Sequence, residues 1–231
     1  MSLRARLLAE FLGTGGLLLI VVGSGIMGES LSQGNAAIAL LANSIATGAG
    51  LYALILTFGH VSGAHFNPAV SLAEFFWRRL SLRELGLYTA AQVAGALTGV
   101  VLTHVIFGLE IFQLSRRARS EPRLLVSEVV ATTGLLLVIA LSGKKTVWAT
   151  PFAVALYITS AYWCTSSTSF ANPAVTIARS FTDTFSGIEW TGAPGFIAAQ
   201  LIGTLLALFL IRVLGTPASA SEQLASKSRI G

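Results

Sequence analysis

The sequence predicts an all-α membrane protein with six transmembrane helices, two re-entrant half-helices and an inverted 3+3 repeat. Three observations lead to this prediction. The chain of 231 residues is 54% hydrophobic and only 11% charged, whereas a soluble domain carries about 25% charged residues. Its apolar runs have the length that crosses a bilayer. Its two halves share a sequence pattern that includes one tetrapeptide present twice.

Six apolar runs account for the predicted spans. A hydrocarbon core about 30 Å thick needs ~20 apolar residues in a helix. The runs cover residues 5–26, 36–60, 84–109, 124–142, 146–164 and 193–214. Arg4 and Arg6 before the first run resemble the start of a signal peptide. Glu10 interrupts that run and no A-x-A cleavage site follows, so we expect a retained helix.

Two shorter apolar segments, 65–79 and 169–183, are too short to span the bilayer and too apolar for ordinary loops. Segments of this length are typical of re-entrant elements, which enter a membrane and leave it on the same side. We therefore expect each of these segments to be a half-helix.

The halves of the chain repeat each other. LLAEFLGTGGLLLIVVGSG at 7–25 matches LVSEVVATTGLLLVIALSG at 125–143, and FNPAVSLAE at 66–74 matches ANPAVTIAR at 171–179. Leucine-rich helices resemble one another in any case, but this does not explain why a glutamate and NPAV recur in the same order. Each half holds three spans, and an odd number of spans inverts the second copy in the membrane.

The predicted organisation is a single transmembrane domain over residues 1–214, with repeats at about 5–107 and 123–214, followed by a mobile tail over 215–231. With the amino end in the cytoplasm, ten Lys and Arg residues lie inside and five outside, so both termini are expected to be cytoplasmic. The basic cluster at 116–123 lies outside against this rule, either as a vestibule feature or, more simply, as a solvated loop.

Each tetrapeptide begins with Asn-Pro-Ala, which is a helix start. Asn caps the free backbone amides, Pro fits the first helical position, and Ala continues the helix. The two copies are Asn67, Pro68, Ala69 and Asn172, Pro173, Ala174. A helix from Asn67 to Arg78 is about 16 Å long, half of a bilayer, so inverted copies can meet near the midplane.

Two facing helix amino ends would place about one unit of positive potential at the membrane centre. That potential repels cations and hydronium but not neutral solutes. Asn67 and Asn172 would donate amide N–H groups to a passing oxygen and break a continuous chain of hydrogen-bonded water. The pattern therefore predicts a passive channel for water and small neutral solutes. The net charge of +5 comes from basic residues scattered between apolar runs, so no nucleic acid is expected as a partner.

Through AEFLGTG at 9–15, GHVSGAHFNPAV at 59–70, the second NPA and all six spans, the sequence resembles the aquaporin and aquaglyceroporin family, also called major intrinsic proteins. The resemblance implies an aquaporin-like fold and a homotetramer with one pore per subunit. NPAVTIARSF is similar to bacterial aquaporins associated with arsenic resistance. This resemblance implies a bacterial-type inner (plasma) membrane, and glycerol-like polyols or undissociated metalloid acids such as arsenous acid as solutes.

The selectivity filter is expected to depart from the family pattern. Most relatives have an arginine directly after the second NPA. Counting from the NPA motifs as in relatives, the filter positions here are Thr47, Ser160, Ser169 and Val175. Replacing a guanidinium by an isopropyl group removes a fixed charge and its donors, which predicts a wider opening.

Arg179 is a further candidate for the filter. It lies one helical turn, about 6 Å, beyond Val175 on the same face. Its side chain either reaches back to the filter and narrows it, or lies at the outer surface or pairs with Asp183. The sequence leaves both alternatives open.

Glu10 and Glu128 occupy equivalent positions in the repeats, inside predicted spans. Each carboxylate either accepts backbone N–H groups from a half-helix loop, as the resemblance also implies, or carries protons in a coupled secondary transporter. His65, two residues before Asn67, can touch the inner pore. The sequence contains no recognisable metal-ligand cluster, phosphate loop or catalytic constellation, so we expect no cofactor and no enzymatic activity.

Overall fold

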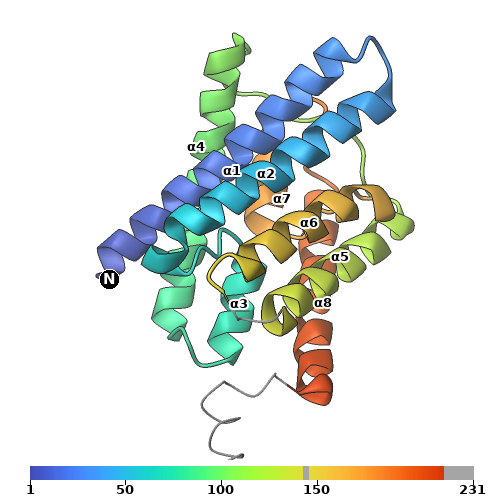
Figure 1. The fold of residues 1–231 in the computed structure, drawn as a ribbon. Helices are drawn as coiled ribbons and strands as arrows, with labels where there is room; N and C mark the ends of the chain where they lie inside the picture. Colours follow the sequence, from blue (N-terminus) through green and yellow to red (C-terminus); the bar gives the residue numbers. More distant parts are fainter. Residues whose placement is uncertain (143–145, 216–231) are drawn as a thin grey trace, which may run out of the picture.

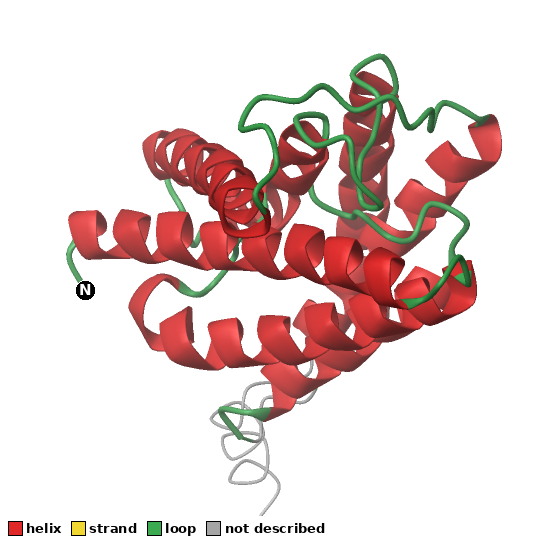
Figure 2. Cartoon of the chain, turned by 90° about the horizontal axis from the view of Figure 1, so that it is seen from above, coloured by secondary structure: helices red, strands yellow, loops and turns green. Residues whose placement is uncertain are grey.

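The computed structural model describes residues 1–142 and 146–215. Over these ranges it consists of helices joined by loops (Figure 1, Figure 2). The predicted tail, apart from Gly215, lies outside the described residues. The helices are α1 (Leu3–Leu31), α2 (Ala36–Ser62), α3 (Pro68–Phe76), α4 (Leu82–Phe107), α5 (Pro122–Leu141), α6 (Ala149–Cys164), α7 (Pro173–Arg179) and α8 (Ala193–Leu214).

The predicted all-α membrane fold is confirmed. Within the described residues, α1, α2, α4, α5 and α8 are each long and apolar enough to cross a membrane. The remaining predicted span, α6, has 16 residues and begins at Ala149 rather than at 146. Pro151 explains this late start, because proline is tolerated only in the first turn of a helix.

The packing of the helices follows the sequence repeat. In the first repeat α1 packs on α2 and α4, and in the second α5 packs on α6 and α8. The short helices α3 and α7 each contact both α4 and α8, one long helix from each repeat. The half-helices therefore join the two halves of the molecule (Figure 1).

Both half-helices are shorter than the sequence indicated. Helix α3 ends at Phe76, because Arg78 adopts a left-handed conformation with φ 60° and the Arg79 amide turns back to the Glu74 carbonyl. Helix α7 ends at Arg179 after seven residues. At 1.5 Å per residue these helices are about 14 and 11 Å long, and neither reaches half of a hydrocarbon core about 30 Å thick.

Small residues bring α1 and α4 into backbone contact. A Cβ atom on Gly95 would overlap the carbonyl oxygen of Phe11, and one on Gly99 would overlap that of Gly15. Close approach through small residues is a common way to pack helices in lipid, where no hydrophobic force drives helix against helix. This contact fixes α1, which carries Glu10, relative to α4.

We expect Gly99→Ala to lower the free energy of unfolding by about 1–3 kcal/mol, because the added methyl group forces the two backbones apart. Gly86→Ala is the matched control in the same helix, since a Cβ atom added at Gly86 would meet nothing within 4 Å. That change should be neutral or stabilising by up to about 1 kcal/mol. Thermal unfolding in detergent measures both, and equal midpoints for the two variants would contradict this account of the contact.

Candidate functional site

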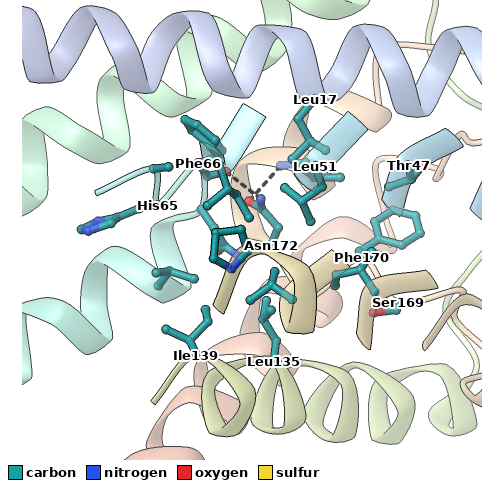
Figure 3. A pocket seen from close by; sticks show the side chains of 18 of the residues that line it. Leu17, Thr47, Leu51, His65, Phe66, Leu135, Ile139, Ser169, Phe170 and Asn172 are labelled. Atoms are coloured by element: carbon teal, nitrogen blue, oxygen red, sulfur yellow. Dashed lines mark hydrogen bonds between the residues drawn. The ribbon is translucent and has the colours of Figure 1, made fainter. Parts of the chain in front are cut away.

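A cavity of about 330 Å³ lies between the amino ends of α3 and α7 and the helices α1, α2, α5 and α6. Apolar side chains of the long helices form much of its wall, including Leu17, Leu51, Leu135 and Ile139 (Figure 3). The loops before α3 and α7 supply much of its polar surface. A solute inside the cavity therefore finds hydrogen-bonding groups on these two loops as well as on Thr47, Thr150 and Tyr162 of the long helices.

Glu10 holds the loop before α3. Its side chain is fully buried and accepts hydrogen bonds from the backbone amides of His65 (3.0 Å) and Phe66 (2.7 Å). Ser62 Oγ at 2.6 Å and Gln92 Nε2 at 2.8 Å donate to the same carboxylate. These four donors compensate the cost of burying a carboxylate, so the loop and the carboxylate stabilise each other.

Glu128 does the same for the loop before α7. It is fully buried and accepts from the backbone amides of Phe170 (2.9 Å) and Ala171 (2.8 Å) and from Gln200 Nε2 (2.6 Å). Both glutamates therefore have the backbone-acceptor arrangement, one of the two interpretations that the sequence left open. Neither of them lines the cavity.

The loops need these anchors because their backbone is strained. Phe66 and Ala171, the residues directly before the two asparagines, have φ values of 50° and 48°. For residues other than glycine, the left-handed region costs roughly 1–2 kcal/mol each. The bonds to the carboxylates offset this cost and fix the direction of the Phe66 and Ala171 carbonyl groups.

Each asparagine of the NPA motifs caps its own half-helix. Asn67 Oδ1 accepts from the Ala69 amide at 2.8 Å, and Asn172 Oδ1 accepts from the Ala174 and Val175 amides at 3.0 and 3.3 Å. The proline that follows each asparagine is the first residue of the helix. These are the local features that the sequence indicated for a helix start.

Each asparagine also bonds to the opposite repeat. Asn67 Nδ2 donates to the Ala171 carbonyl at 2.7 Å. Asn172 Nδ2 donates to the Phe66 carbonyl at 2.8 Å (Figure 3). Both side chains line the cavity. Because a primary amide carries two N–H groups, each asparagine retains one donor beyond this bond.

Three of the four residues expected at the filter line the cavity, namely Thr47, Ser169 and Val175. Thr47 Oγ1 lies 3.2 Å from the hydroxyl of Tyr162, which also lines the cavity. Ser169 Oγ is buried and has no hydrogen-bond partner among the described residues. It can therefore bond to a solute.

The expectation for Ser160 was wrong. Ser160 is exposed, donates to the Tyr157 carbonyl and does not line the cavity. Ile158 and Tyr162, four residues apart on α6, share the face that does. Ser160 lies two residues from each and therefore on the opposite side of the helix. The i, i+4 spacing of Ile158 and Tyr162 is the signal that would have found the correct register.

Arg179 lies in the wall of the cavity and is only 2% exposed. Its Nε donates to the Ser186 carbonyl, and its guanidinium carbon lies 3.4 Å from the centre of the Phe170 ring. Asp183 instead accepts from the Arg116 amide at 2.9 Å. The alternatives of an exposed Arg179 or a pair with Asp183 are therefore wrong. Phe170 was not among the predicted site residues, because nothing in the sequence distinguishes it from other apolar residues that only pack.

The other end of the cavity has its own polar groups. His65 lines the cavity, with Nδ1 3.0 Å from Ser71 Oγ. Glu74 and Arg79 also line it and form an ion pair at 3.0 Å. Within residues 1–142 and 146–215, no group of three or more His, Cys, Asp and Glu side chains could hold a metal ion.

The sequence matches the model of a protein family and is similar to known proteins. The family model described as Major intrinsic protein matches residues 1–147. The chain is 50% identical to Aquaglyceroporin AqpS of Rhizobium meliloti (strain 1021), over 94% of this chain and 93% of that protein. It is 30% identical to Aquaporin NIP2-1 of Oryza sativa subsp. japonica, over 97% of this chain and 76% of that protein.

A solved structure shares the fold. The X-ray structure of the aquaglyceroporin from Plasmodium falciparum matches with a TM-score of 0.72 at 19% sequence identity, over 91% of this chain and 96% of that chain. At this identity the match shows the fold alone.

We expect Glu10→Gln to lower the free energy of unfolding by about 2–3 kcal/mol, because hydrogen bonds to a charged acceptor are lost and an amide donor faces backbone N–H groups. The control is Glu29→Gln in the same helix, which breaks only a surface pair with Arg117 and should change stability by less than about 1 kcal/mol. Thermal unfolding in detergent gives both values. If Glu10→Gln is as stable as Glu29→Gln, the carboxylate does not hold the loop.

Proposed function

The chain belongs to the major intrinsic protein family, a family of membrane channels and not of enzymes, and from this premise we propose that it conducts water and small neutral solutes passively. The solutes are glycerol-like polyols and undissociated metalloid acids such as arsenous acid. One observation carries the proposal: Asn67 and Asn172 bond across the two repeats and both line the cavity.

Exclusion of ions follows from the same meeting point. The amino ends of α3 and α7 carry partial positive charge, and the long helices around them supply an apolar wall. A cation would lose its hydration there without gaining an acceptor of opposite charge. Each asparagine donates to a passing oxygen, which orients single water molecules and interrupts proton transfer along them.

The proposed filter consists of Thr47, Ser169, Val175, Arg179 and, in place of Ser160, Tyr162. Val175 leaves the position after the second NPA apolar, and Arg179 supplies a guanidinium one turn further along α7. The hydroxyl groups and the guanidinium can bond to hydroxylated solutes. Polyols and undissociated metalloid acids share this hydroxyl chemistry, which supports a channel that is not restricted to water.

We further propose the arrangement in the cell. The chain is a multi-pass membrane protein, and the distribution of its basic residues supports cytoplasmic termini in a bacterial-type inner membrane. Residues 1–214 would form a single channel domain. Large apolar side chains are exposed on the outer faces of α1 and α8, including Leu8, Leu12, Leu205 and Phe209. Such faces suit contact with lipid or with neighbouring subunits of a homotetramer.

Proton-coupled transport through Glu10 and Glu128 is the second candidate. Their backbone and glutamine donors already occupy both carboxylates, and neither side chain lines the cavity. A carrier group has to exchange protons with the solute pathway, so this arrangement favours the channel. Solute flux into sealed vesicles separates the two, because only coupled transport responds to an imposed pH gradient.

In sealed vesicles the protein is expected to raise permeability to water, glycerol and arsenous acid, with fluxes that follow only the solute gradient. Val175→Arg should lower glycerol and arsenous acid permeability at least about tenfold, a barrier of about 1.4 kcal/mol, with a smaller effect on water. Val175→Ile, which adds one methylene, is the control. Stopped-flow light scattering measures these rates. Glycerol flux that survives Val175→Arg unchanged would contradict the proposed filter.

Asn172→Asp is expected to let cations leak. Aspartate still caps α7, but it removes the amide donor and places negative charge where the helix ends repel cations. We expect sodium or proton flux into vesicles, followed with an ion-sensitive dye, to rise at least about tenfold. Asn35→Asp alters an exposed cap at the start of α2 and should leave flux unchanged. If the Asn172→Asp channel conducts water normally and still excludes cations, the helix amino ends and the Asn172 amide are not what excludes them.

A further inference from the structure

The segment between α4 and α5, residues 108–121, is tied to the loop that follows α7. The Ser115 amide donates to the Ser180 carbonyl at 3.0 Å, and the Glu189 amide donates to the Arg117 carbonyl at 2.7 Å. A Cβ atom on Gly187 would overlap Ser115 Oγ, so the two segments are in tight contact. The backbone around Arg119 is therefore fixed next to the end of the cavity that Arg179 lines.

Arg119 differs from the other arginines of its cluster. Arg116, Arg117 and Arg123 each pair with a carboxylate at the surface, as a solvated loop would. Arg119 turns inward, and burial lowers its pKa from the usual value. No ion pair among the described residues includes it. The solvated-loop interpretation of the cluster is therefore wrong for Arg119.

The Arg119 guanidinium connects two loops. Its Nε donates to the Gly187 carbonyl at 2.9 Å, and its Nη1 donates to the Ser167 carbonyl at 3.2 Å. Its central carbon lies 5.3 Å from the centre of the Phe170 ring. Arginine suits this position because its planar fork can bond to two acceptors and also lie against an aromatic ring.

Arg119 and Arg179 share their surroundings. Both guanidinium groups lie against the Phe170 ring, and they bond to the consecutive carbonyl groups of Gly187 and Ser186. Phe170 and Arg179 line the cavity, whereas Arg119 does not. Any movement of Arg119 therefore reaches the cavity through Phe170 and the loop that holds Arg179.

We propose that Arg119 is a positioning residue for solute selectivity: it holds Phe170 and the 186–187 carbonyls in place and thereby keeps Arg179 in the cavity wall. This role rests on the proposed channel function. Without the Arg119 guanidinium, the Ser167 and Gly187 carbonyls lose a donor and the ring loses one of its two cationic neighbours. Arg179 then gains freedom to leave the wall, and the opening widens for solutes larger than water.

The test compares glycerol and water permeability in the same vesicles for wild type, Arg119→Ala, Arg119→Lys and Arg116→Ala. The ratio of the two permeabilities is independent of how much protein is folded. We expect Arg119→Ala to raise the glycerol-to-water ratio about threefold or more. Arg119→Lys should lie between Arg119→Ala and wild type, because an ammonium keeps the charge but cannot reproduce the fork. Loss of Arg116, whose side chain is 91% exposed, should leave the ratio unchanged.

Two results would overturn the role of Arg119. One is an unchanged ratio in Arg119→Ala, which includes a proportional loss of both permeabilities. The other is an equal change of the ratio in Arg116→Ala. If Arg119→Ala fails to fold, Arg119→Lys decides: a raised ratio supports the role and a wild-type ratio overturns it. Wild-type vesicles that pass neither water nor glycerol would instead refute the channel function itself, and this role with it.

Discussion

The backbone N–H groups in the loops before the two half-helices need hydrogen-bond acceptors inside the membrane. The buried carboxylates of Glu10 and Glu128 supply these acceptors. No water in the bilayer core can bond to a free N–H group, so each loop takes its acceptor from a neighbouring long helix. With the loops fixed, the carbonyls of Phe66 and Ala171 face the asparagines of the opposite repeat. The geometry of the channel centre thus depends on two acidic side chains that lie outside the cavity lining.

The two repeats agree at their anchors and differ at their ends. Glu10 and Glu128 have matching roles, as do the glutamines that bond to them. Glu74 and Arg179 occupy corresponding positions four residues after the valine of each NPAV, and both line the cavity. One is acidic and pairs with Arg79, while the other is basic and lies against Phe170. The repeat therefore fixes the scaffold, and one residue that differs near the carboxyl end of each half-helix gives the two ends of the cavity different chemistry.

Sequence reasoning succeeded where the signal was local. Apolar run length identified the spans, and Asn-Pro-Ala located the starts of α3 and α7 to the residue. Ser160 was misplaced because its position was counted back from Asn172 as in relatives, across a loop with left-handed residues at 168, 169 and 171; the number of residues in such a loop does not determine which face of α6 lines the cavity. The contacts of Arg119 and Phe170 depend on how the 108–121 segment folds over α7, and no local pattern encodes such a tertiary contact.

The crossed asparagine bonds have a consequence for how the molecule is made. Ribosomes release the first repeat before the second exists, so for a time the Phe66 carbonyl lacks Asn172 and the Asn67 amide lacks Ala171. Unpaired polar groups are costly in lipid. The nascent amino-terminal half must therefore keep its half-helix near water or an insertion partner until translation of the carboxy-terminal half is complete. The side-chain amides of Asn67 and Asn172 therefore matter both for membrane insertion and for conduction.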